Sequence, residues 1–336
     1  MYTTKSFIYS KDDSPSNVTG SAITPTETAS TPLPIVTDTT QVATPTAITA
    51  YPTKKGFILH WKKMKDISGY EIQYSKNKNF KNYESINIKN RNTLRKTIKK
   101  LKKNTKYYAR IRAYKTTKNQ IIYGDFSKEV SVKTAGTVTY LYKEGFYSEK
   151  ISSAVEKRML GKSYKKNEVI SLSDLRYVRV LHYNYNGKIK SGELVVHKKI
   201  EKKVVKIFYE LYQNKYPIQR MRLIDDYNAD DNKSMEQNNT SAFNFRKAVG
   251  STNLSKHAYG LAIDINPRIN PYVKNGTILP KNGKTYVQRD TSLCTGKYKD
   301  NMIQKNDIVY KIFTKYGFTW GGDWYSLKDY QHFQIN

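Results

Sequence analysis

Two histidines and one aspartate occur in patterns that suit metal binding. His257 belongs to SKHAYGLAID, in which Asp264 interrupts an otherwise apolar run, and His332 opens the terminal segment HFQI. A carboxylate inside an apolar strand is costly to bury unless it has a partner. Two imidazoles and one carboxylate supply three zinc ligands and leave a fourth position for water, as in catalytic sites. The sequence therefore predicts that His257, Asp264 and His332 bind Zn2+.

A water activated by a metal also needs a carboxylate that takes its proton and passes it to the leaving amine. Asp329, three residues before His332, is our candidate for this role, and Asp323 in WGGDW is its competitor. The structural alternative is that Asp264 pairs with one of the many lysines and that His332 is an ordinary strand residue.

The other three histidines and the single cysteine lack such a pattern. His60 lies in a predicted sandwich strand, and His182 and His197 lie in a predicted hairpin without a carboxylate at useful spacing. We expect structural roles for all three. Cys294 has no partner for an internal disulfide, so stability must come from packing or from metal.

The elements that must position these residues lie in residues 136–336. The predicted order is a helix over 148–161, a hairpin over 177–197 that turns at Asn186-Gly187, a helix over 198–216, a strand over 218–224, a loop over 230–246, a strand over 261–265, a loop over 266–300 and a helix over 307–317. This order indicates an α+β domain built on an antiparallel sheet. We expect the helix over 148–161 and the loop over 266–300 to form the walls of its pocket.

Residues 46–135 show short alternating strands separated by turn signals, which predicts a β-sandwich. The strands are expected at 57–61, 70–75, 84–88, 107–114 and 130–134. Trp61 suits a core anchor and Tyr107 an interstrand corner, as in sandwich domains. The segment resembles a fibronectin type III domain of the lysine-rich kind on surface proteins of Gram-positive bacteria, which implies a spacer or wall-binding role. Residues 1–45, rich in Thr, Pro and Ser, read as a disordered linker.

The metal motif carries a second resemblance. The pattern Ser255-x-His257-x-x-Gly260-x-Ala262-x-Asp264, followed by Asp329-x-x-His332, resembles the zinc D-alanyl-D-alanine carboxypeptidase family, whose metal site is shared with lysostaphin-type enzymes and the hedgehog signalling domain. WGGDW is typical of the branch with L-alanyl-D-glutamate endopeptidases. The resemblance implies a hedgehog/D-Ala-D-Ala-peptidase-like α+β fold, zinc on the two histidines and Asp264, and hydrolysis of peptidoglycan stem peptides. It implies Asp329 as acid/base, where many relatives have Glu.

The chain departs from the family at the oxyanion-stabilising arginine. Many relatives carry a Ser-Gly-Tyr-Arg-like motif about thirty residues before the first histidine, which places a cation near the developing oxyanion. No such motif stands there, and Arg246 in SAFNFR is our candidate, with Arg222 in RMRLI as the alternative. Arg246 has an equal alternative role, pairing with a substrate carboxylate or with Asp230 or Asp231. Ser255 is expected either to bind substrate or to cap a turn.

The amino-acid composition limits the kinds of binding partner that the protein can have. The net charge of +31 attracts polyanions, and with no recognisable nucleic-acid module we expect anionic cell-wall polymers rather than nucleic acid. No apolar run is long enough to span a membrane, and MYTTKSFIYSKDD lacks the apolar core of a signal peptide. We expect a monomer at the cell wall of a Gram-positive bacterium, exported and leader-trimmed or released as a lysin.

Other functions have less support in the sequence than the zinc peptidase. A serine peptidase is disfavoured because Ser-Asp-Asn and Lys-Thr-Gly are missing. A thermolysin-like peptidase is disfavoured because its His-Glu-x-x-His motif is absent. The alternative from another class is a wall-binding or adhesion protein that retains the metal site without catalysis. A lysine-driven nucleic-acid binder has only the charge in its favour. The motif does not decide between carboxypeptidase and endopeptidase action.

Overall fold

The structure is a computed structural model that describes residues 41–118 and 120–336. The predicted linker over 1–45 therefore lies almost entirely outside the described residues. Within the described part of the chain, no helix has the length and apolar character needed to cross a membrane.

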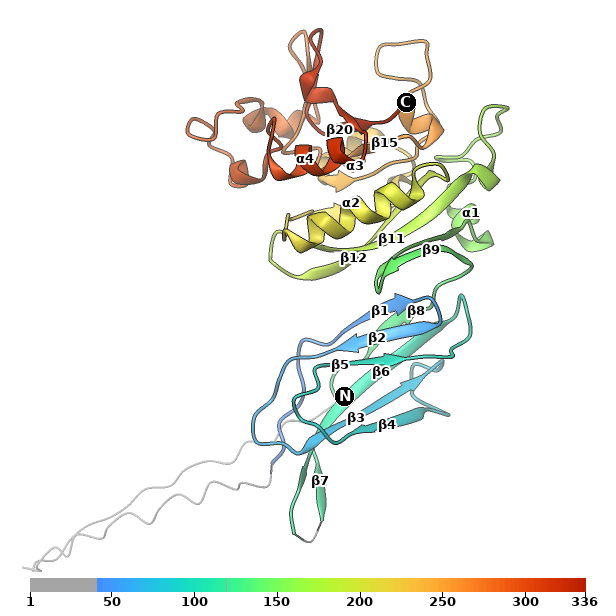
Figure 1. Ribbon diagram of the computed structural model, residues 1–336, viewed down its shortest axis with the longest axis vertical. Coiled ribbons are helices and arrows are strands. Elements are labelled where there is room, and N and C mark those ends of the chain that lie inside the picture. Colours follow the sequence, from blue (N-terminus) through green and yellow to red (C-terminus); the bar gives the residue numbers. More distant parts are fainter. Residues whose placement is uncertain (1–40, 119) are drawn as a thin grey trace, which may run out of the picture. The chain divides into compact units, whose positions relative to one another are not determined.

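Residues 49–133 form an antiparallel sandwich of two sheets (Figure 1). One sheet has the order β1-β2-β5, and the other has the order β4-β3-β6-β7, with β8 also paired to β6. The bounds are β1 (Thr49–Thr53), β2 (Gly56–His60), β3 (Gly69–Ser75), β4 (Glu84–Ile88), β5 (Arg95–Ile98), β6 (Lys106–Thr116), β7 (Ile121–Tyr123) and β8 (Val130–Lys133). All five predicted strands are present, and β1, β5 and β7 were not predicted.

The sandwich core contains the aromatic anchor and the corner that the sequence predicts. Trp61 and Tyr70 are buried, with their ring centroids 5.3 Å apart in an edge-on arrangement. The hydroxyl of Tyr107 accepts a hydrogen bond from the backbone N–H of Lys102 at 3.3 Å. This bond joins β6 to the turn that precedes it, as in a tyrosine corner.

The C-terminal region is built on a four-stranded antiparallel sheet of order β12-β11-β10-β9. Its strands are β9 (Val138–Lys143), β10 (Phe146–Lys150), β11 (Leu175–Tyr183) and β12 (Ile189–His197). The predicted hairpin is confirmed, since β11 pairs with β12 and Gly187 takes a φ of 65° at the turn. That left-handed conformation costs glycine little.

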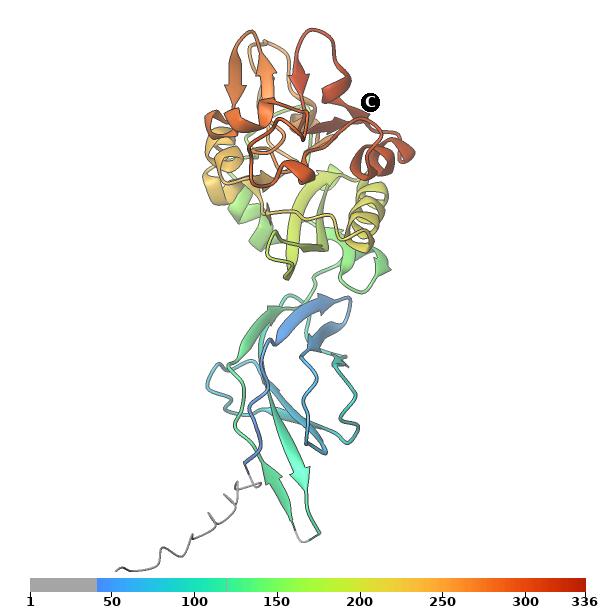
Figure 2. The ribbon, with the colours of Figure 1, turned by 90° about the vertical axis from the view of Figure 1, so that its left-hand side faces the viewer.

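Helix α2 (Glu201–Gln213) packs against this sheet (Figures 1 and 2). Its buried residues Val204, Ile207, Phe208 and Leu211 recur at the three- and four-residue spacing of one helix face. Helix α4 (Ile308–Lys315) packs on α2 and buries Phe313 against Phe333 with ring centroids 4.1 Å apart. The predicted helices over 198–216 and 307–317 are therefore confirmed with shorter bounds.

Two small sheets hold the metal motif. The first has the order β15-β20-β18 and the second β17-β16-β19. Their strands are β15 (Ala262–Asp264), β16 (Tyr272–Lys274), β17 (Thr277–Leu279), β18 (Thr319–Trp320), β19 (Lys328–Asp329) and β20 (His332–Gln334). A parallel pair joins β13 (Arg220–Met221) to β14 (Asn239–Thr240). The C-terminal region thus contains both helices and antiparallel sheets.

Several predicted elements of the C-terminal region are wrong in part. In the segment 148–161, residues up to Lys150 extend β10, and helix α1 covers only Ser153–Met159. Pairing of β10 with both β9 and β11 outweighs the helical pattern, and Ser152 starts the helix by accepting from the N–H of Val155. In the segment 218–224 the strand covers only the two residues of β13, and Ile224 already begins a 3-10 helix.

The two predicted loops also contain regular structure. The segment 230–246 contains α3 (Asp231–Glu236), whose N-cap Asp230 accepts from the N–H of Lys233 at 3.1 Å. The segment 266–300 contains the β16–β17 hairpin, which turns at Asn275-Gly276 with positive φ at both residues. The dipeptide Asn-Gly is a hairpin signal that could have been recognised in the sequence.

Candidate active site

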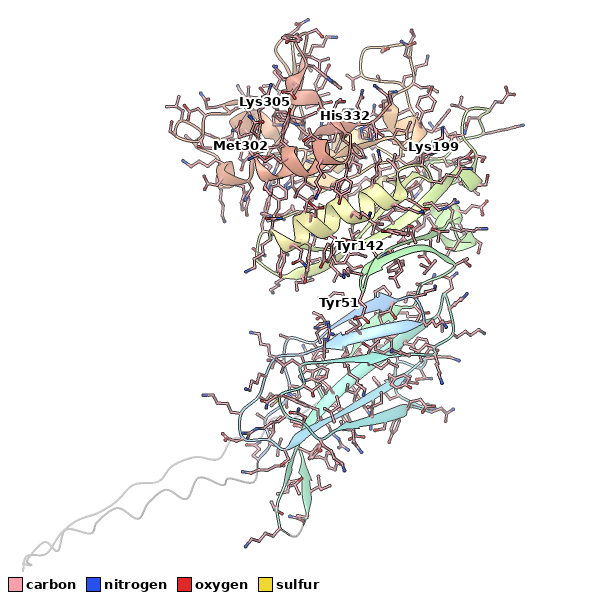
Figure 3. The ribbon with its side chains drawn as sticks, in the orientation of Figure 1. Tyr51, Tyr142, Lys199, Met302, Lys305 and His332 are labelled. Carbon is pink, nitrogen blue, oxygen red and sulfur yellow. The ribbon has the colours of Figure 1, made fainter. Side chains whose placement is uncertain are left out.

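Three buried side chains converge where β15 meets β20. Asp264 and His332 are directly opposite each other in the antiparallel pair, and His257 lies on the short 3-10 helix η3 (Lys256–Tyr259) just before β15. Asp264 Oδ1 lies 3.2 Å from His257 Nε2 and 3.1 Å from His332 Nδ1, and the two nitrogens are 3.1 Å apart. All three residues are buried. Figure 3 labels His332, which lies above α2 in that view.

The other ring nitrogen of each histidine is held by the protein. His257 Nδ1 lies 2.5 Å from the carbonyl oxygen of Ala242, and His332 Nε2 lies 3.0 Å from Oε1 of Gln334. Both partners are acceptors, so each engages one ring N–H and leaves the opposite ring nitrogen for another contact. The opposite nitrogens are His257 Nε2 and His332 Nδ1, which lie next to the shared carboxylate. A partner of this kind fixes tautomer and ring orientation in metal-binding histidines.

The donor set fits a tetrahedral zinc ion. Zinc bonds of about 2.0–2.1 Å place neighbouring tetrahedral ligands about 3.3 Å apart. The three donor atoms are separated by 3.1–3.2 Å, so a common ion at that bond length needs only a small adjustment. Burial raises the pKa of Asp264, but His257 and His332 lower it by more, so its carboxyl group is ionised. Two imidazoles and a carboxylate with one open position match a catalytic zinc site.

Asp329 lies beside this triad on β19, where it pairs with Tyr272 of β16. Its Oδ1 is fully buried and has no hydrogen-bond partner among the described residues. Burial raises the pKa of Asp329 to about 6, with a lowering effect from His332 and a raising one from Asp264. A Cβ at Gly321 would lie 2.6 Å from the carbonyl oxygen of Asp329, so the glycine of WGGDW allows this close approach.

Asp323, the competitor for the acid/base role, faces elsewhere. Its carboxylate pairs with Lys305 at 3.3 Å, and it does not line the cavity that contains the triad. Asp329 lines that cavity together with the three converging residues. The structure therefore favours Asp329 over Asp323 as the carboxylate available to a substrate.

The cavity has a volume of about 440 Å³ and is open to solvent on one side. Arg246 lines it and forms an ion pair with Asp231, which is also in the lining. Arg222 does not line it and pairs with Asp226 at 3.2 Å. Of the two candidate arginines, only Arg246 thus shares the cavity with the triad.

The cavity walls differ from those expected. Tyr272 and Leu279 from the segment 266–300 line the cavity as expected, but no residue of 148–161 does, so that wall prediction is wrong. Ser255 lines the cavity and also caps η3, where its hydroxyl accepts from the N–H of His257 at 3.3 Å. Apolar side chains complete the lining, namely Met235, Val249, Leu254, Leu279, Trp324 and Leu327.

The remaining sequence candidates lie outside the site. His182 is buried with Nδ1 2.9 Å from the carbonyl oxygen of Ile218, and His197 Nδ1 accepts from the N–H of Lys199. Cys294 is a buried, free cysteine in a separate apolar cluster. Sequence reasoning missed Gln334, although it follows His332 by two residues in a strand and so shares its face.

Two family models match this chain. Residues 249–335 match the model described as D-alanyl-D-alanine carboxypeptidase, and residues 43–133 match the fibronectin type III domain. The chain contains a fibronectin type III domain and, C-terminal to it in the sequence, a D-alanyl-D-alanine carboxypeptidase-family domain. The peptidase-family match includes the triad and Asp329 but begins after Arg246. The suspected resemblance is therefore confirmed, and the domain bounds 46–135 and 136–336 stay predictions.

Several solved structures with similarity to the chain are fibronectin-type domains. They include the chicken CNTN1 FN1-FN3 domains (19% identity, 28% of this chain and 33% of that chain, TM-score 0.25) and the FN5 domain of Drosophila Lar (23% identity, 28% and 98%, TM-score 0.23). The chain thus spans about a third of the first of these structures. A search of curated proteins found no match.

Proposed function

We propose that the C-terminal domain is a zinc-dependent peptidase that hydrolyses peptide bonds in peptidoglycan stem peptides. The observation that carries this proposal is the convergence of His257 Nε2, Asp264 Oδ1 and His332 Nδ1 within 3.2 Å of one another, beside the unpartnered buried oxygen of Asp329. The peptidase-family match over the same residues supports it.

Each residue has a defined task in the proposed reaction. His257, Asp264 and His332 would hold the ion, with their orientation fixed by Ala242 and Gln334. When bound, zinc supplies a Lewis acid and lowers the pKa of a water to about 7. Asp329 takes a proton from the attacking water at its buried Oδ1 and passes it to the leaving amine.

The cavity offers two cations to a stem peptide that carries a negative charge. Arg246 and Lys256 line it together with three aspartates, and apolar side chains make up much of the rest. Arg246 is fixed by Asp231, so its guanidinium is oriented before substrate binds. A cation in this position stabilises either a developing oxyanion or a carboxylate of the stem peptide. The substrate class implies action outside the cell, at the wall.

Purified muropeptides provide the direct test. We expect the protein loaded with zinc to convert them to products with one peptide bond cleaved, identified by mass spectrometry, and the chelated protein to be inactive. The mass of the released fragment distinguishes carboxypeptidase from endopeptidase action. Stoichiometric zinc without hydrolysis of any muropeptide would instead support a wall-binding protein that retains the metal site.

A further inference from the structure

The sandwich contains a basic hollow that the peptidase site does not use. Its volume is about 740 Å³, and it lies at the end of the domain where β3 leads into β4 and β5 leads into β6. Four exposed lysines line it, and they are called the groove lysines below: Lys76, Lys81, Lys99 and Lys100.

The groove lysines have little compensating charge around them in the part of the chain that the structure describes. Within residues 41–118 and 120–336, none of the four forms an ion pair with an acidic side chain. Glu84 is the single acidic residue in the lining. The surrounding domain is also strongly basic, because residues 46–135 contain 23 Lys and Arg against 5 Asp and Glu. A concave surface with one sign of charge concentrates ligands of the opposite charge.

The floor of the hollow is rigid. Tyr74 and Tyr107 line it, and both rings pack against buried Phe57, with centroids 6.1 Å and 6.3 Å away. The buried hydroxyl of Ser75 donates to the carbonyl oxygen of Lys81 at 3.0 Å and accepts from the N–H of Asn77. These bonds hold the β3–β4 connection, so the backbones of Lys76 and Lys81 are ordered before a ligand arrives. Preorganisation of this kind lowers the entropic cost of binding.

The four lysines suit phosphate groups. Arginine recognises carboxylate and phosphate alike with two parallel hydrogen bonds, and lysine also binds phosphate, as a point charge. The lining contains four lysines and no arginine. Lysines carried by two separate connections also suit a chain with regularly spaced charges better than one compact anion.

We propose that this hollow binds a phosphodiester-linked anionic polymer of the cell wall, and so holds the protein near its substrate. The choice of a wall polymer over other phosphodiester polymers rests on the proposed peptidoglycan function. The binding site itself is independent of the metal triad, because the two lie in different domains.

The test compares two variants of the full chain with equal loss of charge. The groove variant replaces Lys76, Lys81, Lys99 and Lys100 by Gln. The control variant replaces Lys62, Lys63, Lys65 and Lys89 by Gln. These control residues are equally exposed, and strand register places them at the opposite end of the sandwich. The probe is poly(glycerol phosphate), with binding measured by calorimetry at low and at moderate salt.

We expect the groove variant to lose affinity by about tenfold or more and the control variant by about threefold or less, with a smaller salt dependence in the groove variant. Equal losses in both variants would overturn the proposal, because they would show a diffuse charge effect. Equal binding of poly-L-glutamate would overturn phosphate selectivity, and tighter binding of duplex DNA would indicate a nucleic-acid surface instead. Hydrolysis of soluble muropeptides should be unchanged in both variants, which separates this result from a failure of the peptidase proposal.

Discussion

His257 and His332 face each other through different ring nitrogens, with Nε2 of the first 3.1 Å from Nδ1 of the second. We expect His257→Ala to lose zinc, because the two ligands that remain form only a weak site. Metal analysis after dialysis should find about one zinc per chain in the wild type and far less in the variant. His60→Ala, in the sandwich, is the control and should retain zinc. Equal zinc in all three proteins would rule out the triad as the metal site.

Gln334 is expected to act on the metal through His332. Its Oε1 accepts from Nε2 and so directs Nδ1 toward Asp264. We expect Gln334→Leu to weaken zinc binding by about 10- to 100-fold, and Gln334→Glu to preserve it because the acceptor remains. Chelator competition measures this without any substrate. Gln213→Leu, exposed at the end of α2, controls for the added apolar side chain, and an equal effect there would remove Gln334 from the site.

Asp329→Asn should separate metal binding from hydrolysis. The amide keeps the size of the side chain but cannot take a proton, so we expect zinc content to remain and kcat to fall by about a hundredfold or more. Asp323→Asn removes a carboxylate that pairs with Lys305 outside the cavity, and it should keep nearly full activity. The reverse pattern would transfer the acid/base role to Asp323.

Part of the candidate metal site could be predicted from local sequence, whereas His332 lies 68 residues after Asp264 and was joined to it with the help of the family resemblance. His257 and Asp264 lie seven residues apart around a glycine turn, and an acid inside an apolar strand is anomalous in any fold. What the sequence could not give is pairing across distance. The sequence named Asp230 and Asp231 as alternative partners of Arg246 without choosing between them, and the structure shows the pair with Asp231. Nothing local showed that β10 takes Ser148 and Glu149 into a sheet.

The fold was predicted best where periodicity is long. The hairpin of β11 and β12 has nine residues in each strand, and α2 has thirteen, so their patterns are clear. Strands β15 to β20 have two or three residues each, too few to show a period. Of these strands, β15 was predicted, from the apolar run over 261–265, whereas the positions of β16 to β19 are set by packing around the site.

Arg246 can be tested against its own partner. If Arg246 acts on the substrate, Arg246→Gln should lower kcat/KM by about a hundredfold, whereas Asp231→Asn should have a small effect because the cation remains in the cavity. If Arg246 serves only to pair with Asp231, the two variants should show equal and modest losses. Steady-state kinetics on one muropeptide, with zinc content checked for each protein, distinguishes these outcomes.

The low pKa of Glu193 makes the stability of the C-terminal domain depend on pH. Its carboxylate accepts from Arg158 at 2.7 Å and 3.0 Å and also contacts Tyr177. Burial raises the pKa of Glu193, but the hydrogen bonds and charges of Arg158 and Arg179 outweigh it and hold the pKa at about 2. Because the native pKa lies below that of the unfolded chain, this group stabilises the fold above pH 4.5, and the stabilisation is lost as the pH falls toward 2.

The size of this effect is at most about 3.5 kcal/mol, since the pKa falls from 4.5 to about 2 and each pKa unit corresponds to about 1.4 kcal/mol. We expect the difference in free energy of unfolding between wild type and Glu193→Gln to be largest near neutral pH and to shrink below about pH 4.5. Urea unfolding at several pH values measures it. Glu129→Gln, which removes an exposed carboxylate 3.8 Å from Lys78, is the control and should show little difference at any pH. A difference for Glu193→Gln that stays constant down to pH 2 would mean that packing, and not the charge of Glu193, stabilises this face of the sheet.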